Sequence, residues 1–197
     1  MLVPLFGACG ETPWHALTSS VATRVPPLSG EAPEGRALRL TLGGRSAYAA
    51  LLQELGERRL WRTASGFVVA TDGPRVVATS GQREVLAATR FDGPDPLLRP
   101  AALLGHAATA RRLVDLMTAD RDPAGMRFGV EIECRLAAQQ TEEEAVLLVE
   151  ERCRGGGAGR FTNRFWVEAE SGAVLRSEQW IGPGLPLLVL EPVSHAS

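Results

Sequence analysis

Lysine is absent from this chain of 197 residues, so all 21 basic side chains are arginine. The 23 acidic residues bring the formal net charge to −2, and residues of both signs are interspersed along the chain. A nucleic-acid partner needs a clustered basic surface, so this pattern argues against one. No apolar run reaches the roughly 18 residues of a membrane-spanning helix, and the sequence predicts no such helix.

Motifs for metal binding and nucleophilic catalysis are also missing. The three histidines, His15, His106 and His195, are too far apart in the sequence to form a metal-ligand motif. No serine lies in a Gly-x-Ser-x-Gly elbow, and the glycines of residues 155–159 lack the lysine and the helix start that a phosphate loop needs. We therefore predict no metal, no cofactor and no catalytic residue.

Neighbouring carboxylates leave open a glycan-processing enzyme as an alternative. Three pairs could supply an acid and a base: Asp92 with Asp95, Glu131 with Glu133, and Glu168 with Glu170. The first and third pairs lie in predicted turns and the second on the polar face of a predicted strand, where carboxylates are ordinarily solvated. An enzyme would need two of them to converge in one cleft.

The dominant pattern that is present is a two-residue hydrophobic period broken by turn residues. Residues 66–71 and 74–79 flank Asp72-Gly73, a dipeptide that supplies the positive φ angles of a tight hairpin turn. Residues 126–138 alternate apolar and polar side chains. Residues 82–89 and 97–105 are exceptions, and their sequences favour short helices or irregular connections.

These short runs predict a mainly β fold, with an antiparallel meander sheet curled into a barrel or half-barrel. Helices of 10 or more residues between the strands, which a parallel sheet would need, are absent after residue 36. The residues predicted to be buried are Phe67, Val69, Val76, Phe128, Val130, Ile132, Val149 and Val167.

The N-terminus carries a pattern of its own. Residues 1–8 are largely apolar and end in Gly7-Ala8 before Cys9, which resembles the end of a bacterial lipoprotein signal. The stretch is short and no basic residue precedes it, so one interpretation is a truncated signal remnant at residues 1–9 with Cys9 as the lipidated residue. A start codon assigned too far downstream would explain the missing front half. The alternative is a short apolar N-terminus of a cytosolic protein.

Tryptophan and arginine residues suggest a surface that could bind sugars. Flat aromatic rings can stack on sugar rings while neighbouring guanidinium groups donate hydrogen bonds. The candidates for glycan binding are Trp61, Arg62, Arg164, Trp166, Arg176 and Trp180. The alternative is that these aromatic residues belong to the core, because large aromatic side chains dominate small cores.

Several stretches resemble a known family. Residues 60–63, 66–79 and 86–97 are similar to the YjbF/GfcB family of group 4 capsule and exopolysaccharide lipoproteins. The C-terminal run is more specific, with Asn-Arg-Phe-Trp-Val-Glu at residues 163–168, Ser-Gly at 171–172 and Arg-Ser-Glu-Gln-Trp-Ile-Gly-Pro-Gly at 176–184. The resemblance implies an outer-membrane lipoprotein, an antiparallel β fold wrapped about a helix, and no established catalytic residue.

From the resemblance we expect a short helix at residues 14–24 that packs in the curled sheet. The expected organisation is a signal remnant at residues 1–9, a helix and linker at 10–35, a YjbF/GfcB-like β domain at 36–193 and a tail at 194–197. The expected partners are exopolysaccharide or exopolysaccharide-secretion proteins, with a lipid anchor to the periplasmic face of the outer membrane. A periplasmic carrier of a lipid or another apolar ligand is the other non-enzymatic alternative.

A periplasmic location would also place the cysteines in an oxidising environment. If Cys9 carries lipid, Cys134 and Cys153 are the two cysteines left, and such a pair tends to form a disulfide in an oxidising compartment. A hairpin centred between Glu143 and Glu144 places these two cysteines opposite each other, and it also sets Leu136 against Glu151. Two buried free thiols are the alternative.

Overall fold

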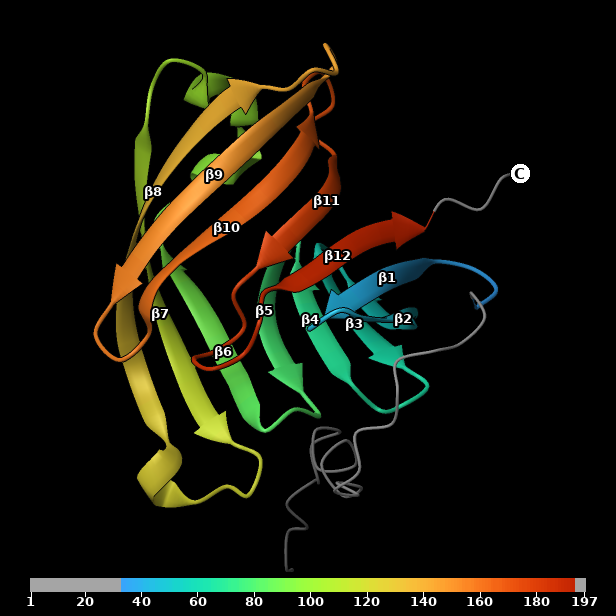
Figure 1. Cartoon of the computed structure of the whole chain (residues 1–197), viewed down its shortest axis with the longest axis vertical. Helices are drawn as coiled ribbons and strands as arrows, with labels where there is room; N and C mark the ends of the chain where they lie inside the picture. Colours follow the sequence, from blue (N-terminus) through green and yellow to red (C-terminus); the bar gives the residue numbers. More distant parts are fainter. Residues whose placement is uncertain (1–32, 194–197) are drawn as a thin grey trace, which may run out of the picture.

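The computed structural model describes residues 33–193 and shows a barrel-like sheet of twelve strands (Figure 1). The strands are β1 (Ala37–Leu42), β2 (Arg45–Leu55), β3 (Arg58–Thr63), β4 (Val68–Asp72), β5 (Arg75–Ser80), β6 (Glu84–Asp92), β7 (Ala108–Thr118), β8 (Arg127–Gln140), β9 (Val146–Gly155), β10 (Gly159–Glu168), β11 (Val174–Gln179) and β12 (Leu188–Val193). The helical elements of this part of the chain are three 3-10 turns: η1 (Pro96–Leu98), η2 (Pro100–Leu103) and η3 (Pro123–Gly125). None of its helices is long and apolar enough to cross a membrane.

The sheet is an antiparallel meander that nearly closes on itself. Its strand order is β5-β4-β3-β2-β1-β12-β11-β10-β9-β8-β7-β6, so every hydrogen-bonded neighbour except the β1–β12 pair is also a neighbour in sequence. The first strand pairs with the last along its whole length, from Ala37 opposite Val193 to Leu42 opposite Leu188. This confirms the predicted fold class of a mainly antiparallel sheet curled into a barrel.

The remaining seam lies between β5 and β6, which are joined by a short turn and form no ladder with each other. At this seam the backbone N–H of Leu86 donates to the hydroxyl of Thr79 at 3.2 Å. The start of β5 contacts a different strand, β11, because the N–H of Val76 donates to Oε1 of Gln179 at 2.9 Å. The side chain of Gln179 therefore connects β11 to the start of β5 through the barrel interior.

The Asp72-Gly73 turn forms as predicted between β4 and β5, with a φ of 53° at Gly73. The prediction for residues 82–89 was wrong, because most of this stretch belongs to strand β6. The register of β6 against β7 shifts between Leu86 and Ala88. Such a bulge interrupts the two-residue hydrophobic period, so the sequence pattern does not indicate a strand here.

Most of the predicted core is confirmed. Six of the eight residues are buried, namely Phe67, Val69, Val76, Ile132, Val149 and Val167, and Val130 is half-buried against them. Phe128 was wrongly predicted, because its side chain is 66% exposed. Gly129, with a φ of 63°, follows it, and the β7–β8 register shifts beside it, so Phe128 falls out of phase with Ile132.

The predicted helix at residues 14–24 and the predicted lipidation site Cys9 lie outside the described residues. Residues 97–105, expected to be short helices or an irregular connection, contain most of η1 and all of η2.

Candidate functional site

A group of charged and polar side chains lies inside the barrel. At its centre is Arg75 of β5, whose side chain is 3% exposed. It donates two hydrogen bonds to Asp95, from Nε at 2.7 Å and from Nη2 at 2.8 Å, and a third from Nη1 to Glu151 of β9 at 2.8 Å. The guanidinium carbon also lies 5.0 Å from the ring centre of Phe91 and 4.9 Å from that of Phe165. Arg75 therefore links β5, the loop before η1 and β9.

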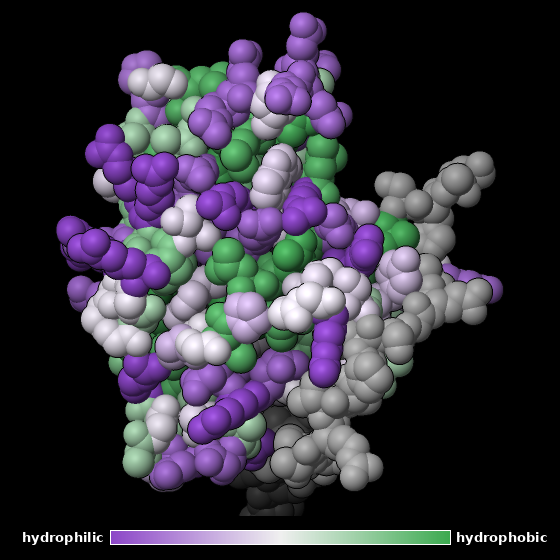
Figure 2. Space-filling model, in the orientation of Figure 1, coloured by the Kyte–Doolittle hydropathy of each residue, from purple (hydrophilic) through white to green (hydrophobic). Residues whose placement is uncertain are grey.

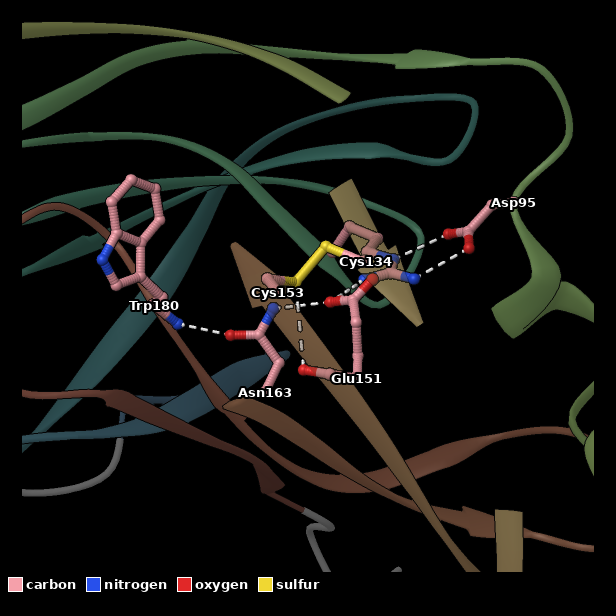
Figure 3. Close-up of a disulfide and its surroundings, with 7 residues drawn as sticks. Asp95, Cys134, Glu151, Cys153, Asn163 and Trp180 are labelled. Carbon is pink, nitrogen blue, oxygen red and sulfur yellow. Dashed lines mark hydrogen bonds and ion pairs between the residues drawn. A yellow bond between two sulfur atoms is a disulfide. The ribbon is translucent and has the colours of Figure 1, made fainter. Parts of the chain in front are cut away.

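Glu151 continues this network into β10 and the segment after β11 (Figure 3). Its Oε2 accepts a 2.6 Å hydrogen bond from Nδ2 of Asn163, and Oδ1 of Asn163 accepts a 2.8 Å bond from the backbone N–H of Trp180. Nearby, the amide of Gln179 accepts from Val76 and donates to the carbonyl of Pro74 at 2.8 Å. We call Arg75, Asp95, Glu151, Asn163 and Gln179 the buried polar centre.

The electrostatics of the centre favour its charged forms. Burial alone would raise the pKa of Glu151, but the nearby Arg75 and Arg112 outweigh it and hold that pKa below its ordinary value. The pKa of Asp95 is likewise lowered, because its hydrogen bonds and ion pair with Arg75 outweigh desolvation. The pKa of Arg75 is raised by the same two carboxylates in spite of its burial.

A second buried arginine, Arg112 of β7, lies beside this centre. Its guanidinium carbon lies 5.9 Å from the ring centre of Phe91 and 5.5 Å from that of Phe161. Within the described residues, its Nε and Nη2 and also Oε1 of Glu151 have no hydrogen-bond partner. Burial accordingly lowers the pKa of Arg112. Its positive charge still stabilises the carboxylate of Glu151.

The predicted disulfide joins Cys134 of β8 to Cys153 of β9 beside Glu151. The two residues stand directly opposite each other, and Leu136 stands opposite Glu151, which is the register expected from the hairpin. Among the described residues, Cys134, Glu151 and Cys153 form the one group close enough to hold a metal ion. The disulfide consumes both thiolates, so this group does not offer a metal site in the oxidised protein.

A pocket of about 510 Å³, which we call the barrel-end pocket, opens where β1, β3, β4, β11 and β12 meet, and its lining includes the β4–β5 and β10–β11 turns at one end of the barrel. Its apolar wall includes Leu38, Trp61 and Leu190, each of which is nearly buried. Charged residues border it, among them Arg36 and Arg59, which both bind the carboxylate of Glu54. A pocket of this size is in the range that holds small-molecule ligands.

The outer face of the sheet carries a continuous chain of ion pairs. We call this chain the ionic network; it runs through Arg152, Glu150, Arg164, Glu178, Arg176 and Glu191 on strands β9 to β12. The contact distances lie between 2.7 Å for Arg152–Glu150 and 3.3 Å for Arg176–Glu191. Figure 2 shows hydrophilic and hydrophobic residues intermixed over this side of the molecule. Hydrogen bonds from Arg152 and Arg164 lower the pKa of Glu150.

Trp166 lies against the ionic network. The guanidinium carbon of Arg176 is 5.1 Å from the centre of its indole ring, and the two residues are register partners on β10 and β11. Arg164 is two residues away on the same side of β10, and it binds Glu150 and Glu178. Three of the six predicted glycan-binding residues, Arg164, Trp166 and Arg176, are therefore together on one outer face.

The other three predicted residues lie apart from this cluster. Trp61 is 5% exposed and donates from its indole N–H to the hydroxyl of Thr71 at 3.1 Å. Trp180 is 6% exposed and stacks on Phe161 with ring centres 4.6 Å apart. Both tryptophans are core residues, which is the alternative that the sequence left open, and neither presents a ring face on the outer surface. Arg62 is exposed on β3.

Sequence reasoning missed the acidic members of the ionic network, Glu150, Glu178 and Glu191. The signal that could have found two of them is strand pairing, because Glu150 and Glu178 are the register partners of Arg164 on its two sides. The buried polar centre left no comparable signal, since Arg75 and Glu151 are 76 residues apart in sequence.

The carboxylate pairs considered for an enzyme occupy separate places. Glu133 is exposed and binds Arg154, with Nη2 to Oε2 at 3.0 Å. Asp95 is held in the buried polar centre, and Glu168 accepts a hydrogen bond from Ser171. A general acid needs a raised pKa, whereas each carboxyl group with a shifted pKa in the described part of the chain has a lowered one.

The fold and its two faces define a β-meander barrel with buried ion pairs in its interior and with arginine, glutamate and tryptophan on its outer face. The family described as "Group 4 capsule polysaccharide lipoprotein gfcB, YjbF" matches residues 36–192, and this chain belongs to that family. The match spans nearly the whole described barrel.

A solved structure has the same fold. The hypothetical lipoprotein YmcC from Escherichia coli K12 superposes with a TM-score of 0.66 at 18% sequence identity, over 84% of this chain and 86% of that chain. None of the curated proteins matches this chain significantly.

Proposed function

We propose that this protein is a non-catalytic binding module of a capsule or exopolysaccharide assembly or export system, anchored by lipid at Cys9 to the periplasmic face of the outer membrane. Membership of a capsule polysaccharide lipoprotein family supports the system and the lipid anchor. The observation that carries the binding role is the cluster of Trp166, Arg164 and Arg176 on the outer face. Its ligand is the polysaccharide or a secretion protein that carries it.

The chemistry of this cluster suits a sugar chain. An indole ring offers a flat apolar surface for the C–H face of a sugar, and the guanidinium groups offer several donors for hydroxyl or carboxylate oxygens. The ionic network fixes these arginine side chains in place before a ligand binds, which reduces the entropy lost on binding. The expected sugar-binding surface is thus preorganised.

Replacing Trp166 with alanine is expected to weaken binding of surface polysaccharide isolated from the source cells by about tenfold, because it removes the stacking surface. The affinity can be measured by isothermal titration calorimetry. Phe128→Ala is the matched control, since it removes an aromatic ring near the start of β8 that is 66% exposed. Equal affinity of Trp166→Ala and the wild type for the polysaccharide would contradict the proposed site.

The lipid anchor gives a second prediction. Cys9→Ser, expressed from a precursor with a complete signal, is expected to move the protein from the membrane fraction to the soluble periplasmic fraction. Two or more acyl chains give stable anchoring, at about 0.8 kcal/mol per buried methylene group. Fractionation and immunoblotting measure the distribution, with Cys134→Ser as the control that retains Cys9. Cys9→Ser remaining with the membranes to the same extent as the wild type would refute lipidation as the anchor.

The pocket at the barrel end favours a second candidate function, that of a periplasmic carrier of a lipid or another apolar ligand. Its wall of Leu38, Trp61 and Leu190 is apolar, and its volume of about 510 Å³ suits such a ligand. Native mass spectrometry of protein purified from membranes tests it. A stoichiometric co-purifying lipid would support the carrier function, and its absence after incubation with fatty acids and phospholipids would reject it.

A further inference from the structure

A row of side chains crosses the outer face from strand to strand. The register places Trp166 of β10 opposite Arg176 of β11. Arg176 binds Glu191 of β12, with Nη1 to Oε1 at 3.3 Å. Glu191 stands opposite Arg39 of β1, and Arg39 stands opposite Tyr48 of β2. We call these five residues the cross-strand row, because register partners in an antiparallel sheet lie side by side perpendicular to the strands.

The row lies on the outside of the barrel along its whole length. Arg39 is exposed between the buried side chains of Leu38 and Leu40. Tyr48 is half-buried between the buried residues Ala47 and Ala49. Since successive side chains of a strand point to opposite faces, Arg39 and Tyr48 share the outer face with Trp166. None of these positions lines the barrel-end pocket.

An aromatic ring stands at each end of the row. Trp166 and Tyr48 are four strand spacings apart, which is about 19 Å along the sheet. Neighbouring strands are hydrogen-bonded across this whole interval, so the surface between the rings is continuous. This length matches several consecutive sugar units rather than one, and the polar residues between the rings can donate and accept hydrogen bonds.

Some charged side chains of the row have an ion-pair partner among the described residues and one does not. Arg176 and Glu191 bind each other, and Arg176 also binds Glu178. Arg39 forms no ion pair with any residue of the described part of the chain, and the same holds for Arg62, which lies one strand beyond Tyr48 at an adjacent outward position. The row therefore has an uncompensated positive charge between its two rings, which favours an acidic ligand.

We propose that the cross-strand row binds an extended acidic glycan whose chain runs perpendicular to the strands. Trp166 and Tyr48 stack on two separated sugar units, and Arg39 binds a carboxylate carried by a unit between them. This inference rests on the proposed function and extends it by naming the direction of the chain, the charge class of the sugar and two further binding residues. None of these follows from the Trp166 cluster alone.

Chain length provides the first test. The probes are oligogalacturonides, glucuronic-acid oligomers and neutral malto-oligosaccharides, each from two to eight units, titrated calorimetrically into the full chain. Acidic oligomers long enough to reach both rings are expected to bind about tenfold more tightly than acidic disaccharides, as a second stacking contact implies. Tyr48→Ala is expected to remove this gain, so that long acidic oligomers bind the variant about as tightly as acidic disaccharides do.

The charge of Arg39 provides the second test. Arg39→Ala is expected to weaken binding of acidic oligomers about fivefold to tenfold in low salt, with little effect on neutral ones, because a charge-assisted hydrogen bond is lost. The control is Arg135→Ala, an exposed strand arginine of β8 outside the row. Unchanged thermal midpoints of the variants confirm that each one is folded.

The outcomes separate this inference from the function on which it rests. If Trp166→Ala abolishes binding of the isolated polysaccharide while Tyr48→Ala and Arg39→Ala behave like Arg135→Ala, the cross-strand row is wrong and the proposed function stands. If neutral oligomers bind as tightly as acidic ones, or no acidic oligomer binds, the row as an acidic-glycan site is overturned. If the isolated polysaccharide also fails to bind, the proposed function fails with it.

Discussion

Replacing Arg75 with methionine is expected to lower the free energy of unfolding by about 3–5 kcal/mol, because it leaves a buried charge without its partner. The carboxylate of Glu151 is fully buried and would keep only the hydrogen bond from Asn163 at Oε2. Asp95 would lose both of its hydrogen bonds from Arg75. Urea unfolding monitored by tryptophan fluorescence measures the change.

The matched control for this variant is Arg58→Met on strand β3, which is separated from β5 by β4. The ion pair of Arg58 with Asp72 is 3.2 Å long, but its side chain is 76% exposed. An exposed pair contributes about 0–1 kcal/mol, so this variant is expected to unfold nearly like the wild type. Equal losses of stability in Arg75→Met and Arg58→Met would show that the buried polar centre does not hold the barrel together.

The difference in the free energy of unfolding between the wild type and Arg75→Met is expected to depend on pH in a definite direction. Glu151 and Asp95 have folded-state pKa values below their ordinary values of 4.5 and 3.8, so their ionisation stabilises the fold above those values. This contribution is lost as the pH falls through the lowered folded-state pKa values. Without Arg75, burial opposes ionisation of Glu151. The stability gap between wild type and Arg75→Met is therefore expected to be largest at neutral pH and to narrow in acid.

The local pairing of strands could be predicted from the sequence because its causes are local. The Asp72-Gly73 turn fixes one hairpin, and the alternation in residues 131–137 fixes the face of each of these side chains. The hairpin between β8 and β9 then sets Cys134 opposite Cys153 without reference to the rest of the barrel. Errors arose where the period breaks, as at Phe128 beside Gly129.

Local sequence does not always predict on which face of the sheet a tryptophan side chain lies. Trp61 and Trp166 both lie on strands near an arginine, yet Trp61 is buried and Trp166 lies on the outer face. The neighbours of Trp166 carried the missing signal, because Phe165 and Val167 share the opposite face and are both fully buried. For Trp61, the flanking residues Leu60 and Arg62 do not indicate which face of the sheet the side chain occupies. Its burial becomes evident only in the closed barrel.

The interior charges could not be predicted in this way. Glu151 lies in the stretch Glu-Glu-Arg-Cys-Arg at residues 150–154, whose four charged residues are typical of a solvated strand. It can be buried because the side chain of Arg75 extends from β5 into the barrel interior and binds it. A partner 76 residues away in sequence leaves no local pattern.

Loss of the disulfide is the other change with a large expected effect. Reduction of Cys134–Cys153 is expected to lower the free energy of unfolding by about 3 kcal/mol, because the bond restricts the unfolded chain around a loop of this size. The urea midpoint of Cys9→Ser protein, measured with and without dithiothreitol, gives the change. The variant Cys134→Ala/Cys153→Ala should unfold at the same urea concentration in both conditions.

The disulfide also has a positional effect, because it joins register partners next to the pair Leu136 and Glu151. A one-residue slip of β9 would turn the carboxylate of Glu151 to the outer face and remove it from Arg75. Reduced protein is therefore expected to lose part of the stability gap between wild type and Arg75→Met, so the effects of the two changes should not add. Thiol titration of denatured, unreduced Cys9→Ser protein checks the premise: two reactive thiols would contradict the bond, and none are expected.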